Sequence, residues 1–351
     1  MAKKSSKSVF RVLGLLVLIV LAVGGYWAYK NIFKSNVHLE QGKKYTYIYI
    51  HTGAQYQDVL DALYTDNIID DHKSFEWTAK EMGLPEHVNP GKYRIGDDMS
   101  NRSLVKMLIN AKQEKVKLYF NSQIRTREQF ENYITDKLEI DAGELEEYLD
   151  DNSKLEELYG LNSENIMALV RPQTLEVNWN TSIDELFGKL KESFNAFWTK
   201  DRLAKAKATG YDVADVIVLG SIVQNESGIK SEQQKIAGVY INRLKQDMRL
   251  QADPTIVFAN GNFDVQRVLN ADKGIDSPYN TYKYKGLPPG PICLVSDQAI
   301  DAVLNYEKHN YTYFCANPDF SGYSRYTSDY KVHMKNAQAY QDALSKKGIK
   351  R

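Results

Sequence analysis

A glutamate at the end of an unusually apolar segment is the residue whose position most clearly predicts chemistry. The segment Val213–Glu226 has helical periodicity, and Glu226 falls on its apolar stripe. The other members of the stripe are Val216, Leu219, Ile222 and Val223. Because burial disfavours the charged form of a carboxyl group, Glu226 could hold a proton near neutral pH as a general acid. Its position also fits a glutamate that reaches solvent or pairs with a basic neighbour.

Four further stretches combine hydrogen-bonding side chains with rigid backbone. A helix predicted over residues 235–245 ends in Asn-Arg, and residues 250–255 (LQADPT) predict a polar loop in which Asp253 is biased toward an extended conformation by the proline after it. Residues 277–282 (SPYNTY) and 286–292 (GLPPGPI) predict rigid, irregular backbone. Taken alone, the last stretch fits equally a stiff connector or a polyproline-like ligand.

Together and in this order, these stretches resemble the YceG-like family of membrane-anchored endolytic murein transglycosylases. The matching segments are residues 221–227 (SIVQNES), 242–244 (NRL), 250–255 (LQADPT), 279–282 (YNTY) and 286–292 (GLPPGPI). The resemblance extends from the N-terminal apolar segment to about Tyr340. It implies a lytic transglycosylase that cuts the β-1,4 bond between N-acetylmuramic acid and N-acetylglucosamine in nascent peptidoglycan strands. The products carry 1,6-anhydro ends, strand length is limited, and no metal or organic cofactor is required.

The resemblance assigns a role to individual residues. Glu226 would be the catalytic acid and base, first protonating the leaving oxygen and then accepting the proton of the substrate's C6 hydroxyl. The residues expected to bind sugar or to orient Glu226 are Ser227, Asn242, Arg243, Gln251, Asp253, Thr255, Tyr279, Asn280 and Tyr282. Arg243 fits equally well as a structural ion-pair partner.

Three departures from the family pattern stand out. The family usually has two glutamates in its first motif, whereas this chain has Gln224 in the first of these positions. Cys293 begins the segment after GLPPGPI, where Asn-Pro-Gly or Thr-Pro-Gly is common, and Ser324 and Tyr326 stand where a histidine and a phenylalanine are usual. Because catalytic groups act as units, a non-catalytic glycan-binding scaffold remains an alternative. A plain peptidoglycan glycosidase, which would need a second carboxylate, is another.

The amino-acid composition argues against two classes of ligand, nucleic acids and metal ions. The chain has 351 residues and 45 basic against 45 acidic side chains, so no overall positive charge favours nucleic acid as a partner. The two cysteines, Cys293 and Cys315, could form one disulfide in an oxidising compartment, and the six histidines lack metal-ligand spacing. We therefore expect no metal site.

An uncharged segment near the N-terminus predicts a membrane anchor. Residues 12–29 span roughly 27 Å as a helix at about 1.5 Å per residue, close to a bilayer core. Tyr26, Trp27 and Tyr29 at its end resemble an interfacial aromatic belt, which favours an uncleaved anchor over a signal peptide. Lysines lie on both sides of the segment, so their distribution indicates its orientation in the membrane only weakly. The expectation of a cytoplasmic tail over residues 1–11 and an extracytoplasmic catalytic domain therefore depends on the function that the resemblance implies. The expected partners are glycan strands, the cytoplasmic membrane and, as candidates, cell-wall synthases.

The remaining pattern predicts an α+β protein with two domains beyond the single transmembrane helix. Residues 37–115 predict a small LysM-like α+β module, with a strand at Tyr45–Ile50 and helices over 57–64, 72–82 and 103–110. Residues 116–345 predict a larger, mostly helical catalytic domain, with helices over 126–138, 142–149 and Ile183–Phe197. Another helix, with Asp201 as its N-cap, is expected to stop at Gly210.

Overall fold

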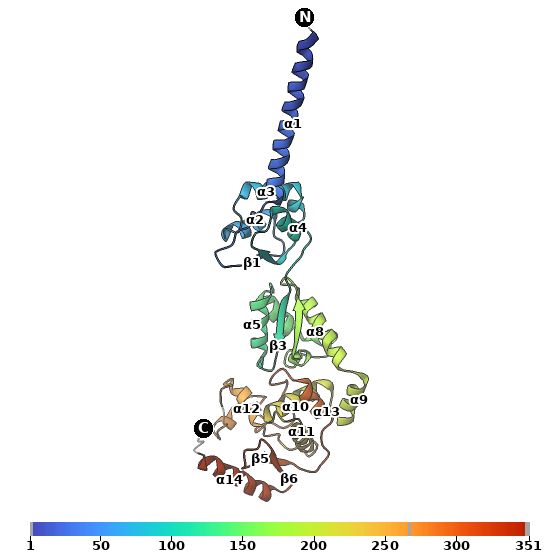
Figure 1. Ribbon diagram of the computed structural model, residues 1–351. Helices are drawn as coiled ribbons and strands as arrows, with labels where there is room; N and C mark the ends of the chain where they lie inside the picture. The colour runs from blue at the N-terminus through green and yellow to red at the C-terminus, as the bar shows by residue number, and fades with distance from the viewer. Residues whose placement is uncertain (1–2, 266–267, 348–351) are drawn as a thin grey trace. The chain divides into compact units, whose positions relative to one another are not determined.

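The apolar N-terminal segment forms the long helix α1 (Lys3–Phe33) in the computed structural model, which describes residues 3–265 and 268–347 (Figure 1). Its stretch Val9–Phe33 is long and apolar enough to cross a bilayer. Large apolar side chains along this stretch are exposed, as they must be on a helix whose surface contacts lipid. The helix is therefore compatible with the predicted anchor over residues 12–29.

The end of α1 is built into the unit that follows it. The backbone carbonyl of Asn31, which has no partner further along the helix, accepts hydrogen bonds from Thr78 Oγ1 at 3.3 Å and Asn101 Nδ2 at 2.8 Å. Trp27 packs edge-on against Trp77, with ring centroids 4.9 Å apart. The helix thus continues into a folded unit directly, beyond the predicted end of the span.

Two compact units make up the chain: Met1–Val116 with Glu176–Thr181, and Lys117–Leu175 with Ser182–Arg351. In the first, β1 (Tyr45–Ile50) pairs antiparallel with β2 (Gly91–Gly96), and alternate residues such as Ile48, Ile50 and Ile95 enter the core. Helices cover that core: α2 (Tyr56–Thr65), α3 (His72–Glu81) and α4 (Asn101–Ile109), with the 3₁₀ turn η1 (Leu84–Glu86). The predicted strand and helices of this unit are confirmed.

The second unit is mixed but dominated by helices, with the two-stranded sheets β3–β4 and β5–β6. Its first half contains β3 (Val116–Phe120), α5 (Arg127–Lys137), α6 (Ala142–Asp150), α7 (Asn152–Tyr159), η2 (Ile166–Leu169), β4 (Gln173–Val177), α8 (Ile183–Phe197) and α9 (Lys200–Thr209). The first residue of β3 and the last two of β4 are grouped with the first unit. Its second half contains α10 (Val213–Glu226), α11 (Lys230–Lys245), α12 (Asp253–Asn260), η3 (Asp272–Gly274), α13 (Asp297–Leu304), β5 (Tyr313–Ala316), β6 (Ser324–Thr327) and α14 (Tyr330–Lys346).

Helix ends required two corrections. The N-cap of α9 is Thr199, whose side chain accepts a hydrogen bond from the Arg202 amide, so the prediction that Asp201 caps this helix was wrong. Asp201 lies in the first turn, and the helix stops at Gly210 as predicted. Helix α11 begins at Lys230, before the predicted residue 235, because charged and polar residues in its first turns hide the apolar periodicity.

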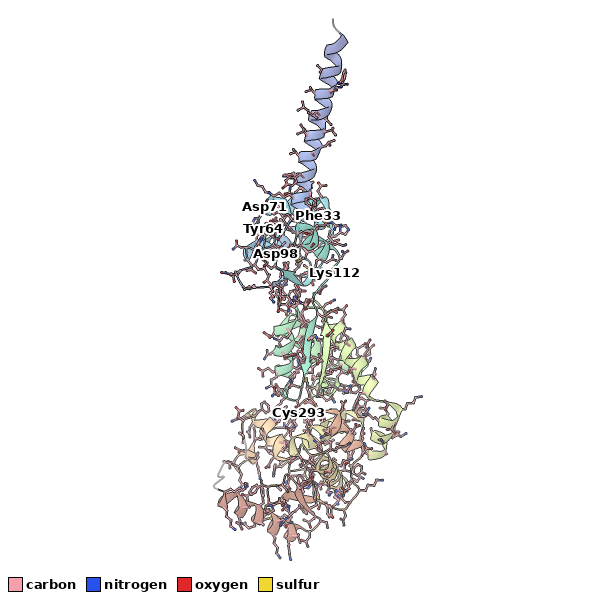
Figure 2. All side chains as sticks on the ribbon, viewed as in Figure 1. Phe33, Tyr64, Asp71, Asp98, Lys112 and Cys293 are labelled. Atoms are coloured by element: carbon pink, nitrogen blue, oxygen red, sulfur yellow. The ribbon has the colours of Figure 1, made fainter. Side chains whose placement is uncertain are left out.

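The two cysteines are free thiols, so the disulfide that the sequence left open is not formed. Cys293 is buried in the second unit, where Figure 2 labels it, and Cys315 is half-buried on β5. Within residues 3–265 and 268–347, the structure contains no group of three or more His, Cys, Asp or Glu side chains that could hold a metal ion.

Candidate active site

Helix α10 is the central helix of the second unit and carries Glu226 as its last residue. Asp212 caps its start by accepting a hydrogen bond from the Asp215 amide at 2.8 Å. Every residue from Val216 to Val223 is buried, so the helix is enclosed on all sides rather than along one stripe. Gly220 permits this enclosure, because a Cβ there would lie only 3.2 Å from a Val295 methyl group.

Glu226 combines partial exposure with a desolvated carboxylate. Its Oε1 accepts a hydrogen bond from the Tyr240 hydroxyl at 2.6 Å. The pKa of Glu226 is raised to about 7, chiefly by burial; the Tyr240 hydrogen bond lowers it, the negative charge of Asp253 raises it, and the Arg243 charge lowers it. No salt bridge to Glu226 occurs among the described residues, which argues against the alternative of a paired structural carboxylate.

Sequence reasoning missed the role of Tyr240. It lies on α11, is 1% exposed, and reads in the sequence as one more apolar member of that helix. Burial and the neighbouring carboxylate hold the pKa of Tyr240 well above its usual value, so the hydroxyl keeps its proton and donates a hydrogen bond to Glu226. The only available signal was a tyrosine on the buried stripe of the helix that follows the glutamate.

The Asn-Arg pair at the end of α11 fixes neighbouring backbone. Buried Arg243 donates to the backbone carbonyls of Thr312 and Leu250, each at 2.6 Å, and it forms no ion pair in the described chain. Asn242 donates to the carbonyls of His309 and Tyr311 at 2.8 and 2.9 Å. Asn242 therefore acts on backbone rather than on the cleft, while Arg243 both clamps backbone and lines the cleft beside Glu226.

Asp253 begins helix α12, with Pro254 in the first turn, so the prediction of a loop with an extended Asp253 was wrong for residues 253–255, whereas residues 250–252 do lie outside helices and strands. Proline suits the first turn of a helix because its missing N–H would have no partner there. The Tyr282 hydroxyl donates a short hydrogen bond to Asp253 Oδ1. This contact links residues 250–255 to residues 279–282 at the cleft.

Among the remaining residues that were predicted to bind sugar, one is exposed in the cleft and two are buried in the fold. Gln251 is exposed and lines the cleft, and its backbone, with φ of 50°, donates to the Thr281 carbonyl at 3.0 Å. Thr255 and Asn280 are fully buried: Thr255 bonds to Thr281 at 2.8 Å, and Asn280 donates to the Ile275 carbonyl at 2.7 Å. They lock the two stretches together and do not reach the cleft.

Tyr279 and Ser227 also make structural contacts. The ring of Tyr279 packs on Phe258 with centroids 4.5 Å apart, and burial raises the pKa of Tyr279 to about 12. Ser227 is the C-cap residue of α10, and its hydroxyl accepts a hydrogen bond from the Ile229 amide at 3.2 Å. Neither residue lines the two cavities that meet at Glu226.

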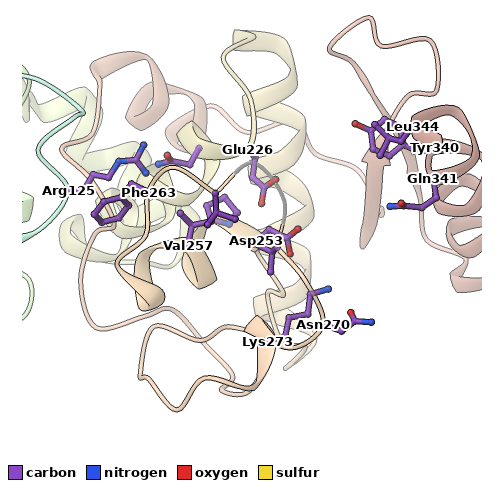
Figure 3. Close-up of a pocket in the computed structure, with 14 residues that line it drawn as sticks. Arg125, Glu226, Asp253, Val257, Phe263, Asn270, Lys273, Tyr340, Gln341 and Leu344 are labelled. Carbon is purple, nitrogen blue, oxygen red and sulfur yellow. The ribbon is translucent and has the colours of Figure 1, made fainter. Parts of the chain in front are cut away.

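A cleft formed by two cavities passes Glu226. Glu226, Asp253 and Lys273 line both cavities, whose volumes are about 690 and 480 Å³. The larger one, shown in Figure 3, extends toward Arg125, Phe263 and Tyr340. The smaller one is lined with aromatic and polar side chains, among them Gln251, Tyr282, Tyr313, Tyr330 and His333.

The GLPPGPI stretch is a buried support for α10. The Ile292 amide donates to Ser221 Oγ at 3.1 Å, and a Cβ on Gly290 would lie 2.1 Å from the Glu164 carbonyl oxygen. Pro288, Gly290 and the residues through Val295 are buried. The alternative of a polyproline-like ligand is therefore wrong, because the stretch is packed inside the unit; a stiff connector remains consistent with its packing.

Two departures from the family pattern contact one another. Gln224 Nε2 donates to Cys293 Sγ at 3.3 Å, and Gln224 Oε1 accepts from the Ser296 amide at 2.8 Å. Gln224 thus holds the segment after GLPPGPI. Ser324 and Tyr326 instead serve a buried carboxylate: the Ser324 amide and the Tyr326 hydroxyl donate to Glu232 at 2.7 and 2.8 Å, away from both cavities.

The chain is similar to known proteins over most of its length. The model of the YceG-like family matches residues 48–339. An endolytic murein transglycosylase of Bacillus subtilis is 26% identical over 341 residues, which cover 93% of each chain. One of Streptococcus pneumoniae is 26% identical over 363 residues, but the match covers 92% of this chain and only 63% of the pneumococcal protein.

A crystal structure shares the fold. The yceG-like protein of Listeria monocytogenes superposes with a TM-score of 0.55 at 24% identity, covering 84% of this chain and 99% of that one. At this identity the likeness concerns the fold alone.

Proposed function

Because the chain belongs to the YceG-like family, we propose that it is an endolytic peptidoglycan lytic transglycosylase in which Glu226 is the catalytic acid and base. The observation that carries the proposal is a glutamate with a pKa of about 7 at the junction of two cavities. Its relatives named as endolytic murein transglycosylases support the same activity.

One carboxyl group is sufficient for the proposed reaction. Protonated Glu226 gives its proton to the glycosidic oxygen as the bond from that oxygen to C1 of N-acetylmuramic acid breaks. The resulting carboxylate accepts the proton of the C6 hydroxyl, whose oxygen bonds to C1 and closes the 1,6-anhydro ring. The carboxyl group is thereby restored, water takes no part, and no cofactor is needed. Asp253 accepts a hydrogen bond from Tyr282, and its charge raises the pKa of Glu226. In this proposal it supports the site and does not attack the sugar.

The cleft supports cutting within a strand rather than at its end. Cavity extends on both sides of Glu226, so sugar units can be held before and after the broken bond. Such an enzyme would release long fragments from nascent strands and limit their length. The proposed sugar contacts are those predicted residues that line the cleft: Arg243, Gln251, Asp253 and Tyr282.

The proposed setting is the outer face of the cytoplasmic membrane. Helix α1 would anchor the protein by one pass, with residues 1–11 in the cytoplasm and the larger domain, residues 116–345, outside. The unit that receives α1 would act as the LysM-like module over residues 37–115, holding the enzyme near new glycan. Cell-wall synthases are candidate partners there.

Product analysis tests this function against its alternatives. Purified protein is incubated with isolated peptidoglycan strands, and the fragments are separated and weighed by mass spectrometry. The proposal expects internal fragments with 1,6-anhydro ends, which are about 18 Da lighter than hydrolysed ends because no water is added. Reducing ends would identify a plain glycosidase, and intact strands would identify a non-catalytic scaffold.

A further inference from the structure

The larger cavity is lined by two cations that form no salt bridge among the described residues, and the carboxyl groups of Glu226 and Asp253 line it too. The cations are Arg125 and Lys273. Arginines elsewhere in the same unit do: Arg127 with Glu131 at 2.6 Å, Arg171 with Asp297 at 2.7 Å and Arg202 with Asp301 at 3.0 Å. Unpaired cations gathered in one cavity indicate an anionic ligand.

Arg125 is held firmly at one side of the cavity. The carbonyl of the preceding Ile124 accepts a hydrogen bond from the Leu294 amide at 3.1 Å, which ties this backbone to the segment beneath α10. The guanidinium group lies 4.9 Å from the centroid of the Phe263 ring, and it is only half-buried. Stacking leaves the in-plane N–H groups of a guanidinium available to a carboxylate.

Lys273 lies where the two cavities meet. Its carbonyl accepts a hydrogen bond from Asn280 at 3.0 Å, which fixes the backbone, and its ammonium lies 4.5 Å from the centroid of the Tyr282 ring. In Figure 3, Arg125 with Phe263 and Lys273 with Asn270 lie on opposite sides of Val257 and Asp253. Apolar side chains line the cavity around the cations, namely Val257, Phe263, Val265, Val268 and Leu344, together with the polar or acidic side chains of Asn225, Glu226, Asp253, Asn270 and Gln341.

We propose that this larger cavity is a subsite for the acidic peptide stem of the substrate, with Arg125 and Lys273 receiving its carboxylates. The inference rests on the proposed function. A glycan chain by itself offers hydroxyl and amide groups, which do not require cations. Carboxylates enter the substrate either through the peptide stem or through the lactyl group of N-acetylmuramic acid once the stem is removed. The apolar side chains of the cavity favour the stem, because they suit alanine methyl groups beside the charges.

The test compares three forms of one glycan preparation. The first carries intact stems, the second has been stripped by an amidase and so exposes lactyl carboxylates, and the third is the stripped form with those carboxylates converted to neutral amides. The release of anhydro ends gives kcat/KM for wild type and for Arg125→Met and Lys273→Met. Arg125→Lys and Lys273→Arg keep the charge, and Lys283→Met removes an exposed, ion-paired lysine that lines neither cavity.

We expect each methionine variant to lose about 10- to 100-fold in kcat/KM on stem-bearing strands, mainly through KM, as for the loss of one charge-assisted hydrogen bond. Both should match wild type on the neutral strands. The charge-keeping variants should recover most of the loss, and Lys283→Met should behave as wild type on all three forms.

Three outcomes would overturn the inference. Equal losses on all forms would make the cations general supports of the site, losses confined to stripped strands would assign them to the lactyl carboxylate, and unchanged rates would remove them from binding. Failure of the proposed function is distinct, because wild type would then form no anhydro ends on any of the three forms.

Discussion

At the scale of single residues, the site depends on a balance around one carboxyl group. Burial raises the pKa of Glu226, and the hydrogen bond from Tyr240 lowers it. The sequence could predict the first effect, because an apolar stripe is local and periodic. It could not predict the second, because the donor is on another helix, 14 residues further along the chain.

Tyr240→Phe tests this balance. General-acid catalysis needs protonated Glu226, so kcat/KM of the wild type should fall as pH rises through about 7, the pKa of Glu226. The Tyr240 hydroxyl favours the charged carboxylate. Its removal should raise the pKa and move the falling limb to higher pH, by about one unit for a hydrogen bond to a charged group. A pH–rate profile measures the shift.

Tyr326→Phe is the matched control, because its hydroxyl donates to Glu232 and lies outside both cavities. In the pH–rate profile of Tyr326→Phe, kcat/KM should fall over the same pH range as in wild type. A limb that stays in place or moves to lower pH in Tyr240→Phe would refute the proposed contribution of this hydrogen bond.

Asp253→Asn separates a supporting carboxylate from a second catalytic one. The amide oxygen can still accept the Tyr282 hydrogen bond, but the charge that raises the pKa of Glu226 is lost. Activity should therefore fall by about tenfold, less than the 10²- to 10⁴-fold cost of losing a general acid or base. Mass spectrometry should still find anhydro products. Reducing ends, or a loss as deep as that of a Glu226 variant, would show that Asp253 has a different role.

At the scale of elements, the family-like stretches proved to support backbone more often than they contact the cleft. Thr255, Asn280 and Asn242 read as polar binding residues, yet their side chains are used within the fold. The sequence shows which type of side chain is present but not whether that side chain points into the cleft or into the fold. The start of α12 within LQADPT was missed for a related reason, since a proline normally marks a break and here occupies the first turn of the helix.

Gly290→Ala tests the support beneath α10. Its Cβ would lie 2.1 Å from the Glu164 carbonyl oxygen, so backbone must shift. We expect a loss of about 1–3 kcal/mol in the free energy of unfolding, as for an overpacked core, measured by urea denaturation. Gly188→Ala is the control: it lies within α8 with open space around a new Cβ, and it should stabilise the protein by about 0.5–1 kcal/mol. Equal stability of the Gly290 variant and wild type would mean that the contact is not tight.

At the scale of the whole molecule, periodicity predicted most helices and the long apolar segment. It could not predict that residues 176–181 would join the first unit, because that grouping depends on contacts between segments far apart in the sequence. The sequence also did not predict that α1 would continue directly into that unit. Its Asn31 carbonyl is satisfied by side chains about 45 to 70 residues further on, at Thr78 and Asn101.

The proposed topology predicts protease sensitivity from outside the cell. If α1 anchors the chain with the larger domain outside, protease added to sealed spheroplasts should degrade everything beyond Lys30. An antibody against the C-terminal helix would follow the loss, and a cytoplasmic protein would serve as the control for intact membranes. Full protection of the C-terminal part would contradict this orientation.

The most direct test of the account is Glu226→Gln. Glutamine keeps the size of the side chain and an oxygen that can accept the Tyr240 hydrogen bond, but it has no proton to transfer. The variant should fold normally by circular dichroism. Its release of anhydro-muropeptides should fall by about 10⁴-fold or more, because one residue performs both the acid and the base step. A folded Glu226→Gln protein that releases anhydro-muropeptides near the wild-type rate would contradict the assignment of this site.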